Sequence, residues 1–211
     1  MNSRRNTLAA LIAGALLICC MPLHAQETGQ GTKAKPQATP DEQEMMKKWM
    51  QVSTPGDAQK KLEDLVGTWD VEMSIWSKGP DAPPSVTHGS AVNTWVLGGR
   101  FVRQEYKGEM MGMPFEGIGY TGYDNYNKKY VSFWIDNSTT QTTTMSGLAD
   151  RSGRTFTLYG TMDEWLTGEN GKTVKYVTRI VNRDKNIFEA YDLGIDGPNQ
   201  RMMEAVYTRK K

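Results

Sequence analysis

Residues 65–69, Leu-Val-Gly-Thr-Trp, are the stretch that decides the fold. An aliphatic pair, a glycine and a tryptophan open a run in which Trp69, Val71, Met73 and Ile75 alternate with polar residues. A period of two is typical of a β-strand with one buried face. A closed β-barrel often begins with such a strand, and further strands of the same kind follow it.

Nine further strand-like segments follow this opening, separated by turn residues. They lie at 85–96, 101–107, 113–123, 129–136, 140–148, 155–163, 174–181, 187–192 and 201–208. Hairpin loops are expected at 124–127, 150–153, 169–172, 183–186 and 196–198. The sequence therefore predicts an all-β domain of about ten antiparallel strands over residues 57–211. Closing the sheet into a barrel removes its exposed edges, which favours a barrel over an open sheet.

The first 25 residues have the pattern of a secretory signal peptide. Arg4 and Arg5 precede an apolar stretch over 8–23, and a small-residue cleavage site ends at Ala25. The stretch is shorter than the roughly 20 apolar residues of a membrane-spanning helix, and Pro22 interrupts it. We expect cleavage near Ala25 and a periplasmic or secreted protein, with no integral membrane segment in the mature chain.

Cleavage would remove both cysteines of the chain, Cys19 and Cys20. Cys20 follows an apolar run, which leaves a lipoprotein as the alternative, although Cys19 stands where Gly, Ala or Ser is expected. A mature chain without thiols has no disulfide and no cysteine metal site, and its one histidine argues against a catalytic metal centre. Its 23 basic and 24 acidic residues argue against nucleic acid as a partner.

The segment before the predicted barrel divides into a linker and a helix. Residues 26–40 contain no apolar residue larger than alanine, so we expect a disordered linker. Thr39 and Pro40 resemble the cap and first turn of a helix over 41–56. One side of this helix carries an apolar stripe formed by Met45, Met46, Trp49 and Met50. Such a stripe packs on its own domain, or serves as a lid or a partner-binding face.

Several motifs, in order, resemble those of the DUF1579 family of uncharacterised bacterial proteins. They are Leu65–Trp69, Asn93–Phe101, Tyr106–Gly117, Gly122–Asp124, Lys129–Tyr130 and Trp134–Asp136. The resemblance covers about residues 57–210 and implies an up-and-down lipocalin-like, or calycin-like, barrel. It implies no established activity and no catalytic residues, because the family is defined by sequence alone. Gly67 and Trp69 match the Gly-x-Trp opening of lipocalins, which implies a structural role at the base of the barrel.

Aromatic and charged residues within the predicted strands are candidates for a binding cavity. They are Trp95, Arg103, Tyr106, Tyr120, Trp134, Asp136, Arg179, Glu189 and Glu204. Parity alone does not say which face is inside, because a slip of one residue reverses every side chain. The charged members could instead pair with one another at the rim. His88 could lie at the surface, transfer protons or, if its face points inward, ligate a haem.

Three classes of function remain open for such a barrel. A barrel of this size is wide enough for one small ligand, so we favour a module that binds a small, partly apolar or amphipathic molecule. An enzyme of the same shape could use Glu189 or Glu204 as a general base. A structural envelope protein with a filled interior would bind nothing.

Overall fold

The computed structural model describes residues 38–77, 79, 81–164, 167–194 and 199–211. The chain divides into two units, residues 1–38 and 39–211, and all of the described helices and strands belong to the second. The expected signal peptide and most of the expected linker lie outside the described residues, as does the hairpin loop expected at 196–198.

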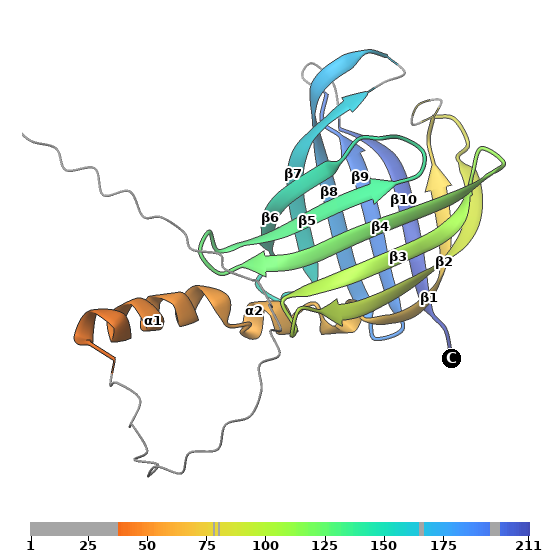
Figure 1. The fold of residues 1–211 in the computed structure, drawn as a ribbon. Helices are drawn as coiled ribbons and strands as arrows, with labels where there is room; N and C mark the ends of the chain where they lie inside the picture. Colours follow the sequence, from red (N-terminus) through yellow and green to blue (C-terminus); the bar gives the residue numbers. More distant parts are fainter. Residues whose placement is uncertain (1–37, 78, 80, 165–166, 195–198) are drawn as a thin grey trace, which may run out of the picture. The chain divides into compact units, whose positions relative to one another are not determined.

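Ten antiparallel strands form a closed barrel (Figure 1). The strands are β1 Gly67–Ile75, β2 Ser85–Val96, β3 Phe101–Met110, β4 Met113–Asp124, β5 Lys129–Asp136, β6 Thr143–Ala149, β7 Thr155–Glu164, β8 Glu169–Asn182, β9 Lys185–Asp192 and β10 Gln200–Arg209. Each strand pairs with its neighbours in the sequence, and β1 closes the barrel by pairing with β10. The predicted fold class, an antiparallel up-and-down barrel of about ten strands, is therefore confirmed.

Side chains alternate between the interior of the barrel and the solvent along each strand. In β1 the buried positions are Trp69, Val71 and Met73, which are the alternating apolar residues of the opening motif. The register carries this pattern around the barrel, because Met73 faces Ala205 of β10, and Ala205 faces Phe188 of β9. The interior of the barrel is therefore built mainly from alternate residues of each strand, and bulges interrupt the alternation in places.

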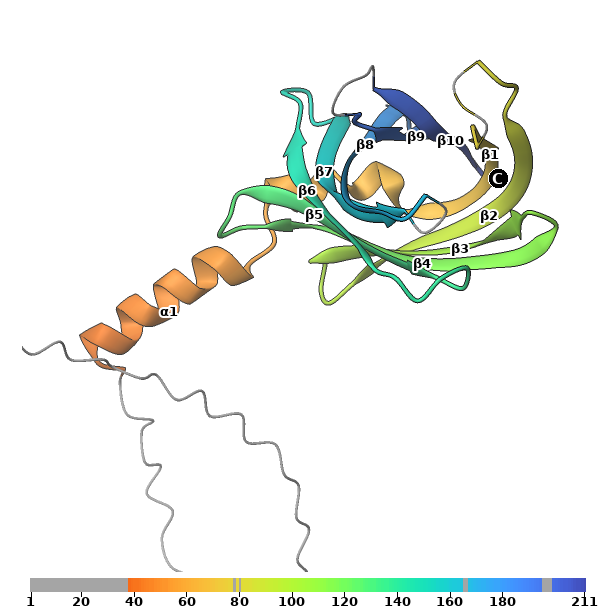
Figure 2. The same cartoon turned by 90° about the horizontal axis from the view of Figure 1, so that it is seen from above.

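A short helical segment closes the base of the barrel, the end at which β1 begins. It consists of α2 Asp57–Lys60 and the 3-10 helix η1 Glu63–Leu65. Leu62, between them, is fully buried in the core, and the Tyr130 hydroxyl donates to the Ala58 carbonyl at 2.9 Å. Seen from above, the segment appears within the ring of strands (Figure 2).

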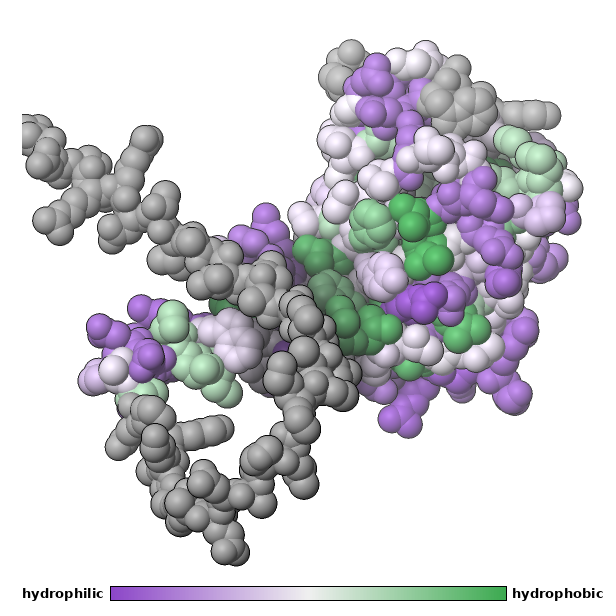
Figure 3. Space-filling view, in the orientation of Figure 1, coloured by the Kyte–Doolittle hydropathy of each residue, from purple (hydrophilic) through white to green (hydrophobic). Residues whose placement is uncertain are grey.

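The N-terminal helix α1 spans Pro40–Ser53 and has no buried residue. A capping box fixes its start: the Thr39 amide donates to Glu42 Oε2 at 2.7 Å, and the Glu42 amide donates to Thr39 Oγ1 at 3.3 Å. Apolar side chains are visible among hydrophilic ones along α1 (Figure 3). The predicted stripe of Met45, Met46, Trp49 and Met50 belongs to this helix, and all four residues are exposed. Among the described residues, no helix is long and apolar enough to span a membrane.

The hairpin between β7 and β8 differs from the sequence prediction. Residues 169–172 lie within β8 and do not form the turn. Glu169 faces Glu164, whereas Lys172 faces Met162, so the pairing carries a bulge. Gly171 adopts a φ of 69° there, and its amide donates to Asp163 Oδ1 at 2.7 Å. The glycine expected to form a turn therefore forms the bulge instead.

Candidate binding cavity

The barrel interior contains a cavity of about 350 Å³. This volume lies at the lower end of the range of small-molecule pockets. Leu62 and Leu65 form part of its wall near the base. The cavity reaches the opposite end of the barrel, here called the mouth, where Ser138, Asp163 and Glu164 line it.

The wall nearest the mouth is organised around Trp134 of β5. Its indole lies across Gly117 and Gly119 of β4, and a Cβ atom at either glycine would overlap the ring. Trp134 Nε1 donates to Asp136 Oδ2 at 2.8 Å. Asp136 Oδ1 in turn accepts from the Ser138 amide at 2.9 Å and from its hydroxyl at 2.5 Å. Both the indole and the carboxylate are therefore held in fixed positions at the cavity surface.

Tyr106 of β3 forms a second aromatic part of the wall, and its side chain is only 2% exposed. Its hydroxyl lies against Gly89 and Gly108, where a Cβ atom would overlap it. The ring packs against Phe115 with 5.7 Å between ring centres. Burial raises the pKa of Tyr106, so the phenol is neutral at physiological pH. Its oxygen has no hydrogen-bond partner among the described residues.

The half of the cavity nearer the base carries a few uncharged polar groups beside its apolar wall. Gln104 Nε2 donates to Asn93 Oδ1 at 3.2 Å, and Asn93 Nδ2 donates to the Leu65 carbonyl at 2.8 Å. Burial raises the pKa of Tyr207 to about 12, against the opposing effect of a hydrogen bond with Gln104. Asn186 also lines the cavity, and its Nδ2 has no partner among the described residues. These groups offer dipoles to a ligand without carrying charge.

Three of the nine predicted cavity residues, Tyr106, Trp134 and Asp136, line the cavity. Trp95 shares the inward parity of Asn93 but packs near the base, where its Nε1 donates to Glu63 Oε2 at 2.7 Å. For the remaining five the prediction is wrong: they face outward, because they have the opposite parity to the lining residues of their strands. They are Arg103, Tyr120, Arg179, Glu189 and Glu204.

The outward-facing charges of β8, β9 and β10 pair with one another. Glu189 is only 5% exposed, because Arg179 and Arg201 cover it from outside the barrel. Arg201 Nη1 also lies 2.6 Å from Glu204 Oε2, and the Tyr191 hydroxyl donates to Glu189 Oε1 at 2.8 Å. In the structure these charges therefore pair with one another, which was the alternative that the sequence left open. Glu189 and Glu204 are not placed to act as a general base in the cavity.

His88 is exposed on the outer face of β2, opposite Glu72 of β1. Its side chain does not line the cavity. The haem-ligand alternative is therefore wrong, because this imidazole cannot bind a haem held inside the barrel. Among the residues that the structure describes, no group of three or more His, Cys, Asp or Glu side chains is arranged to hold a metal ion.

Sequence reasoning missed the polar residues near the base, namely Asn93, Gln104, Asn186 and Tyr207. Gln104 lies two residues before Tyr106 in β3, and Asn93 two before Trp95 in β2, so both share parity with residues that were selected. Asn186 was assigned to a hairpin loop, although it lies in β9 opposite Tyr207.

The comparisons with known proteins identify a family and a fold. A family model described as "Protein of unknown function (DUF1579)" matches residues 54–209. Rv2717c from M. tuberculosis is similar at 16% identity and a TM-score of 0.53, with 75% of this chain and 100% of that one covered. The S-type phycobiliprotein lyase CPES from Guillardia theta is similar at 11% identity and a TM-score of 0.50, with 74% and 99% covered. No curated protein matches the chain. The structural matches support the lipocalin-like class of barrel, and at these identities they show the fold alone.

Proposed function

This chain belongs to the DUF1579 family of proteins of unknown function, and from that premise we propose that it is an exported protein that binds a small, partly apolar molecule inside its barrel. The cavity of about 350 Å³ carries this proposal. A protein with a purely structural role has no need of an internal space lined by ordered aromatic and polar side chains. Ligand sites combine such apolar walls with a few placed polar groups.

The composition of the wall supports binding by burial of apolar surface. Tyr106, Phe115, Trp134, Tyr176 and Phe188 all contribute to the lining. A ligand that buries roughly 300 Å² of apolar surface gains about 7 kcal/mol at ~25 cal/mol per Å². Association costs of several kcal/mol reduce this gain, so apolar burial alone accounts for an affinity in roughly the millimolar range, and polar contacts at the wall would have to supply any tighter binding.

Export is the second part of the proposal and is supported by the leader sequence. Arg4 and Arg5, the apolar stretch and the site at Ala25 match a secretory signal peptide. N-terminal sequencing of protein from fractionated cells of its own source tests this. Mature protein that begins at Gln26 in the periplasm or the medium supports export, and an intact leader on protein in the cytoplasm contradicts it.

Binding is tested by filling the cavity with a larger side chain. Thr178 of β8 lines the cavity, and its neighbour across the sheet is Phe156 of β7. Thr157, the next residue of β7, has the opposite parity and does not line the cavity. Thr178→Trp should abolish the fluorescence enhancement of N-phenyl-1-naphthylamine, a neutral apolar probe, whereas Thr157→Trp should retain it.

Two outcomes would contradict cavity binding. The first is that the wild-type protein gives no enhancement with the probe and carries no small molecule when its native mass is measured after purification from its own source. The second is that Thr178→Trp and Thr157→Trp bind the probe equally well, which would place the bound probe outside the barrel.

A further inference from the structure

We propose, on the basis of the proposed function, that the cavity selects ligands whose polar end is positively charged and discriminates against ligands that end in a carboxylate, sulfate or phosphate. The charges on the cavity wall point to this. Asp136, Asp163 and Glu164 line the cavity, and the described part of the lining contains no Lys, Arg or His. Every formal charge on the described wall is therefore negative.

The carboxylates lie where the polar end of a ligand would rest. Asp136 is the last residue of β5, and Asp163 and Glu164 are the last residues of β7, so all three lie at the mouth. Lys172 of β8 is a nearby cation outside the lining. Its Nζ lies 2.8 Å from Asp192 Oδ2 and 3.4 Å from Glu169 Oε2. Two carboxylates thus surround this ammonium and neutralise its attraction for an anion.

The inner wall gives a second, independent reason to expect the charged end of a ligand at the mouth and its apolar body inside the barrel. Asn186 and Tyr106 are 4% and 2% exposed, and each has a polar atom without a partner among the described residues. Away from the mouth, the described lining thus offers neutral dipoles and aromatic faces but no charge to neutralise an ionic group. Burying an unpaired charge there is costly. An apolar body should enter the barrel while a charged end stays at the mouth.

The arrangement at the mouth also suits a cation better than a neutral polar group. Asp136 is hydrogen-bonded to Trp134 Nε1, so a carboxylate and an indole lie together on the same wall. An alkylammonium beside them gains both charge pairing and attraction to the aromatic face. Asp163 is also fixed, by the Gly171 amide. Because hydrogen bonds already order these groups, a ligand does not have to order them on binding.

The test compares three probes that share a ten-carbon chain and differ in the polar end. They are decyltrimethylammonium, decan-1-ol and decanoate, each used below its micelle concentration to displace N-phenyl-1-naphthylamine at pH 7.5. Partly exposed ion pairs contribute modestly, so we expect the ammonium probe to bind roughly 5-fold more tightly than decanol. We expect decanoate to bind more weakly than decanol, and the differences to shrink in high salt.

A double variant, Asp163→Asn with Glu164→Gln, should remove most of the preference for ammonium over decanoate. The matched control is Glu72→Gln with Glu116→Gln, which changes the net charge equally on the outer faces of β1 and β4 and should leave the preference intact. If decanoate binds as tightly as the ammonium probe, or if both double variants behave alike, the inference is overturned while the proposed binding function stands. If no probe displaces the fluorophore and the fluorophore itself does not bind, the proposed function fails, and this inference fails with it.

Discussion

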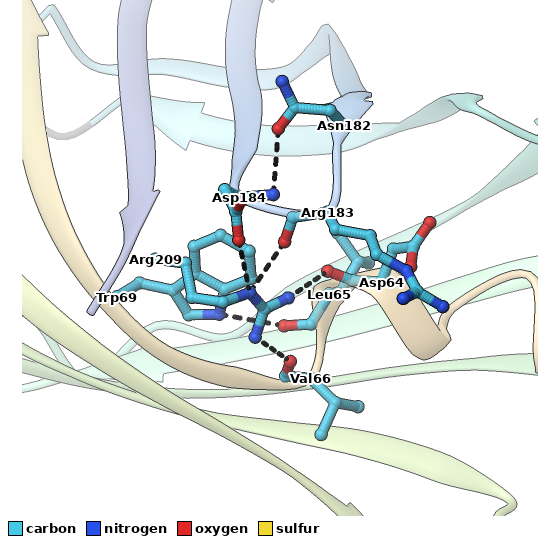
Figure 4. Close-up of polar contacts among 8 residues, drawn as sticks. All are labelled: Asp64, Leu65, Val66, Trp69, Asn182, Arg183, Asp184 and Arg209. Atoms are coloured by element: carbon cyan, nitrogen blue, oxygen red, sulfur yellow. Dashed lines mark hydrogen bonds and ion pairs between the residues drawn. The ribbon is translucent and has the colours of Figure 1, made fainter. Parts of the chain in front are cut away.

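The guanidinium of Arg209 stacks on the indole of Trp69, with 4.2 Å between Cζ and the ring centre (Figure 4). Its nitrogens donate to three backbone carbonyls: Nη1 to Val66 at 2.8 Å, Nη2 to Asp64 at 3.1 Å and Nε to Arg183 at 2.7 Å. A Cβ atom at Gly67 would overlap Nη1. One side chain of the last strand thus fixes the segment that enters the first strand, at the seam where the barrel closes.

Replacement of Arg209 should destabilise the whole barrel. Arg209→Met keeps an apolar stem over Trp69 but leaves three carbonyls without their donor, and we expect a loss of about 2–4 kcal/mol in the free energy of unfolding, measured with urea. Lys210→Met is the control, since the Lys210 side chain forms an exposed ion pair with Asp70, 3.0 Å away, and its loss should cost less than about 1 kcal/mol. Equal losses in the two variants would contradict a closing role for Arg209.

Glu189 should contribute to stability without contributing to binding. Glu189→Gln removes the charge that pairs with Arg179 and Arg201 on the outside of the barrel, and we expect a loss of about 1–3 kcal/mol in the free energy of unfolding. Glu116→Gln breaks the exposed pair with Lys107 and should cost less than about 1 kcal/mol. Binding of N-phenyl-1-naphthylamine should be unchanged in both variants. If Glu189→Gln alone weakens the affinity for the probe, this carboxylate contributes to the binding site.

Most of the barrel was predictable from the sequence, because each strand carries its own period-two signal. The alternation of Trp69, Val71 and Met73 is local information, and so is the cap at Thr39. The turn between β7 and β8 was not predictable in the same way. The Asn170-Gly171 sequence is compatible with a β-bulge as well as with a turn. The pairing of Glu169 with Glu164 determines that a bulge forms.

The composition of the cavity was less predictable, because parity within a strand does not reveal which face is inside. Glu189 is buried as deeply as a core residue, yet it lies on the outer face under two arginines. A buried carboxylate and a cavity carboxylate look alike in the sequence. Only the register across β8, β9 and β10 separates them, and this register depends on contacts between residues distant along the chain.

Helix α1 should be dispensable for the stability of the barrel. None of its residues is buried, and deleting residues 40–51 retains the carbonyls of Val52 and Thr54 that accept from Asn125 Nδ2 at 3.1 and 2.7 Å. We expect the free energy of unfolding to change by less than about 1 kcal/mol. Leu62→Ala is the contrasting variant, since Leu62 is fully buried, and should cost about 2–5 kcal/mol. A truncation as destabilising as Leu62→Ala would show that the apolar stripe of α1 packs on a surface.

Tyr207 should make the protein less stable at high pH. Burial raises its pKa in the folded state to about 12, compared with about 10 in an unfolded chain. Above pH 10 the unfolded chain loses this proton while the folded chain keeps it. The contribution of Tyr207 to stability is therefore fully present below pH 10 and is lost as the pH rises toward 12.

The measurement is urea unfolding at pH 9 and pH 11 for the wild type and for Tyr207→Phe. Ionisation of Tyr207 in the unfolded state should cost the wild type about 1 kcal/mol at pH 11, and this part of the loss should be absent from Tyr207→Phe. Tyr126→Phe serves as the control, since this ring is 79% exposed, and it should lose as much stability as the wild type. If Tyr207→Phe loses as much as the wild type between the two pH values, the phenol is not held in its neutral form by the folded barrel.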